Sequence, residues 1–189
     1  MPLPIYEPRV ISSGLRGFRL MYAARAGFDS QQSKKAKKTA NAERAGAFLP
    51  TRQRYEHMPS KLEIGRTYQS QTRVEEWMTA AKAGNRGVDV LSTPMLLQLI
   101  EEAAVHCLAP VLAQDDVSLG SYVDLTHLAP TPVGLIVRTE VEIIAIDGRR
   151  IDFAVAAFDE REKIAEGTHE RYVIERPAFL ATLDEKNAP

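Results

Sequence analysis

The segment PMLLQLIEEAAVHCLAPVL, residues 94–112, decides the fold of this chain of 189 residues. Most of its apolar side chains fall on one broad arc of a helical wheel. A polar stripe runs along another side at i, i+4 and i+8: Gln98, Glu102 and His106. Thr93 is a residue type that caps helices, and Pro94 suits the first helical position, where a missing N–H does no harm. The segment therefore predicts one long helix with a buried face, which ends or kinks near Pro110.

Amphipathic strands flank this helix in the sequence. We expect strands at residues 62–74, 120–128, 135–145, 150–158 and 163–175. Asp147–Gly148 is a strong hairpin-turn signal, and short turns make the last four strands antiparallel. One face of such a sheet is apolar, and only one long apolar helix is available to cover it. The pattern favours an α+β chain with the hot-dog arrangement, an antiparallel sheet wrapped around one long central helix.

The chain divides near residue 58 into two parts of opposite charge. Residues 1–57 carry 11 Lys or Arg against four Asp or Glu, a net charge of +7, and the remainder carries 13 against 21, a net charge of −8. Much of the first part is polar and basic without apolar periodicity, which is typical of disorder. We expect a basic, disordered extension at 1–57, a hot-dog domain at 58–182 and a C-terminal tail at 183–189.

Three interpretations of the basic extension stay open. It is a non-folding extension with Met58 as an alternative start, an organellar presequence, or an interaction arm. The cluster Lys34–Lys38 lacks interleaved aromatic residues, so we expect no nucleic-acid partner. No stretch approaches the roughly 18 consecutive apolar residues that cross a bilayer, so we expect no membrane association.

Cys107 is the only cysteine, which excludes an intrachain disulfide and a cysteine-based metal cluster. It lies within the apolar pattern of the helix and is interpreted as a small buried hydrophobe rather than a nucleophile. This cysteine usage fits a reducing, cytoplasmic location.

Two titratable residues are candidates for chemistry. Glu101 lies at the edge of the apolar arc of the helix, about 40° from Leu97. A carboxylate there is either paired or has its pKa raised by lost solvation, which suits acid–base catalysis, unless it is an ordinary flanking residue. His127 ends a strand before the stiff turn APTPVG, 129–134. Its imidazole could polarise a carbonyl or shuttle a proton, or it could be a plain surface residue.

Other residues have both a structural and a functional interpretation. Thr93 is a cap, yet it marks a helix N-terminus that favours negative charge developing on oxygen. Gly120 is a turn glycine or a position where a backbone N–H approaches a ligand. His169 and Arg171 share one side of a strand, either as edge or interface residues or with Arg171 binding phosphate or a carboxylate.

Four stretches together resemble the fluoroacetyl-CoA thioesterase-like branch of the hot-dog superfamily. They are LSTPMLLQLIEEAAVHCLAP (91–110), SLGSYVDLTHLAPTPVG (118–134), GRR (148–150) and GTHERYVIER (167–176). The similarity covers about residues 60–180 and leaves the basic extension unmatched. The resemblance implies a homodimer with two active sites at the subunit interface and acyl-CoA substrates.

The resemblance also implies site residues. The catalytic hydroxyl of the family falls on Thr93, its carboxylate on Glu101 and its histidine on His127. Gly120 matches the glycine beside the thioester, and Arg171 matches an arginine near the site. The fluoroacetate enzyme of this family has a phenylalanine-rich lid before the central helix, whereas AAKAGNRGVDVLS (80–92) contains no aromatic residue. We therefore expect a broader or different acyl group.

The predicted function is hydrolysis of a small or medium acyl-CoA to a free acid and CoA, with no metal and no cofactor beyond the CoA of the substrate. A non-catalytic acyl-CoA-binding protein of the same fold is the alternative. The sequence leaves open whether Glu101 is a nucleophile or a general base. It also leaves open whether dimers pair into tetramers.

Overall fold

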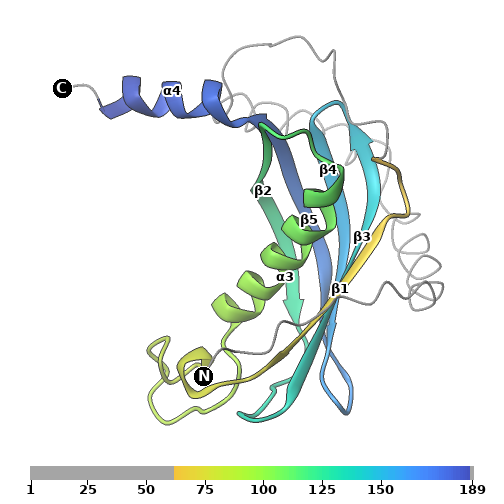
Figure 1. The fold of residues 1–189 in the computed structure, drawn as a ribbon. Helices are drawn as coiled ribbons and strands as arrows, with labels where there is room; N and C mark the ends of the chain where they lie inside the picture. The colour runs from red at the N-terminus through yellow and green to blue at the C-terminus, as the bar shows by residue number, and fades with distance from the viewer. Residues whose placement is uncertain (1–61, 188–189) are drawn as a thin grey trace, which may run out of the picture. The chain divides into compact units, whose positions relative to one another are not determined.

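The computed structural model describes residues 62–187, drawn in colour in Figure 1. The predictions for the basic extension at 1–57 lie outside the described residues. No helix within the described part is long and apolar enough to cross a membrane.

Five strands form one antiparallel sheet in the order β1-β3-β4-β5-β2. They are β1 (Thr67–Arg73), β2 (Asp116–His127), β3 (Ile136–Asp147), β4 (Arg150–Phe158) and β5 (Lys163–Glu175). All five were predicted, and the largest differences lie at the starts of β1 and β2. β1 begins later than expected because a turn at Gly65, whose φ is 90°, precedes it. β2 begins earlier because Asp116 already pairs with Glu175 of β5.

The predicted long helix is α3, Thr93–Leu108, and a short 3₁₀ turn, η2 (Ala109–Val111), follows it. The prediction that Thr93 caps the helix is wrong by one residue. Ser92 is the N-cap, because its backbone is extended and its side chain accepts a hydrogen bond from the Met95 N–H. The α-helix stops short of Pro110, as the missing N–H of proline requires.

Helix α3 lies along one face of the sheet (Figure 1). Its apolar arc shares one buried core with the inward-facing residues of β3 and β4. The apolar faces expected for those strands are buried, but Glu140 of β3 and Ala154 and Ala156 of β4 are buried as well. The fully buried members of this core include Leu96, Ile100, Ala103, Ala104, Val137, Val141, Ile143, Ile151, Phe153 and Val155. A sheet covered by one long helix is the hot-dog fold.

A 3₁₀ turn and a C-terminal helix were not predicted. A 3₁₀ turn, η1, spans Glu76–Met78 and buries Met78. Helix α4 spans Arg176–Asn187, where the end of the domain and a tail were expected. Its sequence combines a proline near the start with Ala and Leu residues, which favour a helix.

Replacement of Ile100 by alanine should destabilise the protein by about 2–5 kcal/mol, because it leaves a cavity where α3 meets the sheet. Chemical denaturation followed by circular dichroism measures this change. Gln98→Ala, on the exposed face of the same helix, is the matched control and should shift stability by at most about 0.5 kcal/mol. Equal unfolding midpoints for both variants would show that α3 does not seal the core.

Candidate functional site

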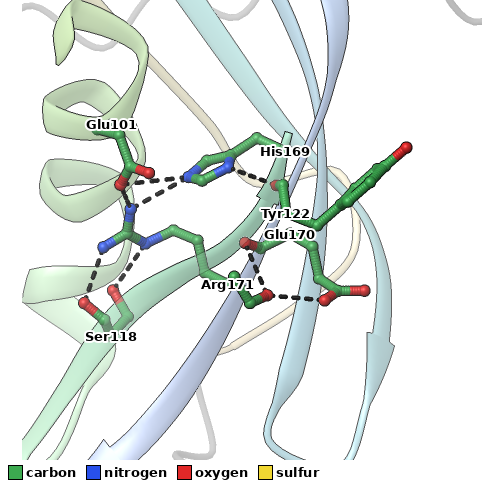
Figure 2. Close-up of polar contacts among 7 residues, drawn as sticks. Glu101, Ser118, Tyr122, His169, Glu170 and Arg171 are labelled. Carbon is green, nitrogen blue, oxygen red and sulfur yellow. Dashed lines mark hydrogen bonds and ion pairs between the residues drawn. The ribbon is translucent and has the colours of Figure 1, made fainter. Parts of the chain in front are cut away.

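A charged pair joins helix α3 to strand β5 (Figure 2). Nη1 of Arg171 donates to Oε2 of Glu101. The opposite side of the guanidinium donates to Ser118 of β2, from Nε to Oγ at 3.0 Å and from Nη2 to the carbonyl oxygen at 2.7 Å. Arg171 is only 2% exposed, so its buried positive charge would be strongly destabilising without these partners.

His169 completes this group, and Figure 2 shows its ring between Tyr122 and Arg171. Its Nδ1 lies 3.0 Å from the carbonyl oxygen of Tyr122, and its Nε2 lies 3.1 Å from Nη1 of Arg171. The same Nε2 is 3.4 Å from Oε2 of Glu101. The ring is 1% exposed and stacks on Phe153.

The interpretation of His169 and Arg171 as edge residues is wrong, because β5 lies inside the sheet between β4 and β2. Arg171 holds a carboxylate, which was the functional alternative. Sequence reasoning placed His169 beside Arg171 by strand alternation but assigned it no role. Ser118 was missed entirely, because no local pattern reports which strand will pair with β5.

Strand β2 is shaped to receive the carboxylate. Its pairing with β5 shifts register between Gly120 and Tyr122, so β2 carries a bulge beside the site. Gly120 lies opposite Arg171, and a Cβ at this position would overlap the Glu101 carboxylate. A side chain at this position would displace the Glu101 carboxylate, which glycine leaves in place.

The surroundings of Glu101 lower its pKa to about 2. Hydrogen bonding to His169 is the largest cause, its charge and that of Arg171 add to it, and desolvation by burial opposes them. Of the two alternatives for this carboxylate, pairing is confirmed and a raised pKa is wrong. The side chain is 36% exposed. Within residues 62–187 no hydrogen bond reaches Oε1, which lies against Gly120.

A second polar pair lies at the start of α3. Oγ1 of Thr93 is 3.0 Å from Nδ1 of His127. Nε2 of His127 is buried and has no hydrogen-bond partner in the described part of the chain. Burial lowers the pKa of His127, against a smaller opposite effect of the Ala129 backbone. The ring is therefore neutral at pH 7.

The loop before α3 brings these two residues together. Its last residues bind the turn that follows β2: Leu91 donates its N–H to the Thr131 carbonyl at 2.8 Å, and Val90 bridges Pro132. Because Thr93 follows this loop and His127 precedes the turn, the contact between loop and turn places the hydroxyl beside the imidazole.

The two polar groups are separate within one chain. Thr93 and Glu101 lie on the same straight helix, about 12 Å apart along its axis. No hydrogen bond or ion pair joins Glu101 to His127 among the residues described. Nor does that part of the chain contain a group of three His, Cys, Asp or Glu side chains arranged to hold a metal ion. The described part of the chain therefore presents two separate polar groups, Glu101 with Gly120 and Arg171, and Thr93 with His127.

Comparison with known proteins identifies the family. The sequence profile of the fluoroacetyl-CoA-specific thioesterases matches residues 74–177. The fluoroacetyl-CoA thioesterase of Streptantibioticus cattleyicolor is 39% identical over 98 residues, which are 52% of this chain and 70% of that protein.

Solved structures agree with the sequence comparison. The fluoroacetyl-CoA thioesterase FlK superposes with a TM-score of 0.64 at 30% identity, over 69% of this chain and 100% of FlK. A hot-dog-like protein from Thermanaerovibrio acidaminovorans superposes with a TM-score of 0.63 at 23% identity, over 67% of this chain and 93% of that one, and supports the fold alone. The chain belongs to the fluoroacetyl-CoA-specific thioesterase family of the hot-dog superfamily.

Proposed function

We propose that the protein is an acyl-CoA thioesterase that hydrolyses a small or medium acyl-CoA to the free acid and CoA. The observation that carries this proposal is the ionised Glu101 carboxylate, which is anchored through Oε2 while Oε1 has no hydrogen bond within residues 62–187. A relative at 39% identity is a fluoroacetyl-CoA thioesterase. A variant of FlK has been solved in complex with fluoroacetate and CoA. CoA enters as part of the substrate, and the chemistry calls for no metal or redox cofactor.

The active form that we propose is a homodimer paired through β2. Among residues 62–187 this strand is at one edge of the five-stranded sheet, so no described strand pairs with its outer backbone groups and a second copy can. A two-fold axis pairs β2 antiparallel to its copy, which runs the His127 end of one strand toward the Gly120 region of the other. Such an assembly joins the two polar groups into one site, with Glu101 from one protomer and Thr93 and His127 from its partner.

The polar groups suggest a role for each residue. When the Thr93 hydroxyl donates to Nδ1 of His127, the neutral ring carries its hydrogen on Nε2 and can donate it to the thioester carbonyl oxygen. Oε1 of Glu101 then attacks the carbonyl carbon, the C–S bond breaks, and CoA leaves as the thiolate. Water cleaves the resulting anhydride and restores the carboxylate.

The lowered pKa of Glu101 favours this nucleophilic role over general base catalysis. A base with a pKa of about 2 holds a proton poorly at neutral pH, and general base catalysis works best when the pKa lies near the working pH.

The segment between β1 and α3 contains one aromatic residue, Trp77, which is 56% exposed. We therefore propose an acyl range that is not restricted to fluoroacetyl groups.

Glu101→Gln should lower kcat by about 100-fold or more for whichever acyl-CoA is hydrolysed, since the amide neither attacks the thioester nor takes up a proton. Thiol release from a panel of acyl-CoAs measures this, and light scattering checks that the dimer is intact. The matched control is Glu102→Gln, the next residue on the same helix, which should retain activity. Full activity of Glu101→Gln would refute its role, and binding of acyl-CoAs without thiol release by the wild type would indicate a non-catalytic binding protein.

The value of kcat/KM should fall as the pH drops through the pKa of His127, because only the neutral ring pairs with Thr93 in the proposed manner. Burial lowers this pKa below the usual 6.5, so the fall should lie below pH 6.5. A pH–rate profile measures this fall, and the residual activity of His127→Gln should not fall in the same pH range. His106→Gln, which removes an exposed histidine of α3, should leave the profile unchanged. A wild-type limb centred above pH 6.5 would contradict a lowered pKa.

A further inference from the structure

We propose that His169 is a positioning residue: it orients Arg171 so that this arginine anchors Oε2 of Glu101 and leaves Oε1 toward the substrate. The inference rests on the proposed thioesterase function and extends it to a buried residue that does not touch the thioester.

The contacts of His169 give each ring nitrogen a partner. The carbonyl oxygen of Tyr122 can only accept, so Nδ1 carries a hydrogen and donates it across 3.0 Å. In the neutral ring Nε2 is then an acceptor, and the donor that faces it is Nη1 of Arg171 at 3.1 Å. In the neutral ring His169 therefore presents a lone pair to the guanidinium, whereas a hydrogen on Nε2 would be donated to Oε2 of Glu101, the contact that lowers the pKa of that carboxyl.

This lone pair determines how Arg171 uses its hydrogens. Nη1 has two, one for Oε2 of Glu101 and one for Nε2 of His169. Nε and Nη2 are occupied by the hydroxyl and carbonyl of Ser118. Because the guanidinium is planar and rigid, contacts on both sides fix the point at which it meets the carboxylate.

Nε2 of His169 thus faces both charged groups, 3.1 Å from Nη1 of Arg171 and 3.4 Å from Oε2 of Glu101. The chain of contacts from Tyr122 through His169 and Arg171 thus ties the carboxylate of α3 to the bulged segment of β2. If His169 had a purely structural role, a flat ring stacked on Phe153 would be enough. An apolar aromatic residue could supply that ring and would need no polar partners.

Two substitutions of His169 separate these roles. His169→Phe keeps a flat ring but removes both polar contacts. His169→Gln keeps one donor and one acceptor in a single amide, with a spacing similar to that of the two ring nitrogens. Val155→Ala, a fully buried position on β4, is the control that weakens the core without touching the polar chain.

The first readout does not require catalysis. The carboxyl of Glu101 is titrated by NMR in protein labelled with ¹³C-glutamate, with the signal assigned from Glu101→Gln. The pKa should be about 2 in the wild type. It should rise toward the usual value of about 4.3 in His169→Phe and remain near wild type in His169→Gln and Val155→Ala. An unchanged pKa in His169→Phe overturns the inference.

The second readout is the kinetics of whichever acyl-CoA is hydrolysed. His169→Phe should lower kcat by about 100-fold with little change in KM, because a displaced carboxylate affects the reaction more than binding. His169→Gln should recover much of that loss. In an Arg171→Met background His169→Phe should add no further loss, since His169 acts through Arg171.

The outcomes keep the two proposals distinct. A kcat loss in Val155→Ala as large as in His169→Phe, or a full additional loss in the Arg171→Met background, overturns the positioning role. If the wild type hydrolyses no acyl-CoA, the thioesterase proposal fails, and the titration of Glu101 still decides whether His169 controls the carboxylate.

Discussion

The guanidinium group of Arg171 is almost completely removed from water, and a buried cation is strongly destabilising unless it is paired and hydrogen-bonded. Desolvation lowers the pKa of Arg171, and the charge of Glu101 opposes this effect. The requirement to satisfy this one group accounts for much of its surroundings. Ser118 accepts hydrogen bonds from one side of the guanidinium, and Glu101 and His169 contact the other side. Gly120 leaves room for the Glu101 carboxylate.

The same arrangement makes Glu101 asymmetric. Oε2 is bound by a buried group, while Oε1 has no hydrogen bond within the described chain and the side chain is partly exposed. A carboxylate held in this way stays charged over the whole physiological pH range. The Thr93–His127 pair differs in kind, because it is neutral and has a buried ring nitrogen without a partner in residues 62–187. A charged group and a neutral donor are complementary requirements for attack on a thioester.

Local sequence patterns predicted most of the fold. The period of the apolar residues in 94–112 and the alternation in 135–145 and 150–158 are local signals, and each matches an observed element. The one-residue error at the helix cap arose because Ser92 and Thr93 are both good caps, and only the backbone conformation decides between them. The bulge in β2 and the role of Ser118 depend on pairing with β5, about 50 residues away, which no local pattern encodes.

The candidate site was predicted residue by residue through the family resemblance, and the structure adds the contacts among those residues. The helical wheel placed Glu101 at the border of the apolar arc but could not choose between a paired and a raised-pKa carboxylate, because Arg171 lies 70 positions later. The role of His169 could not be predicted from local sequence either, because its contacts lie on three different elements.

In the proposed dimer, Glu101 of one protomer acts with Thr93 and His127 of the other. Co-expression of Glu101→Gln and His127→Gln chains with two different tags allows the heterodimer to be purified. If the site is shared between protomers, this heterodimer contains one intact site and one doubly altered site, and it should recover about half of the wild-type thiol-release rate although each parent homodimer is inactive. A heterodimer as inactive as its parents would contradict the shared site.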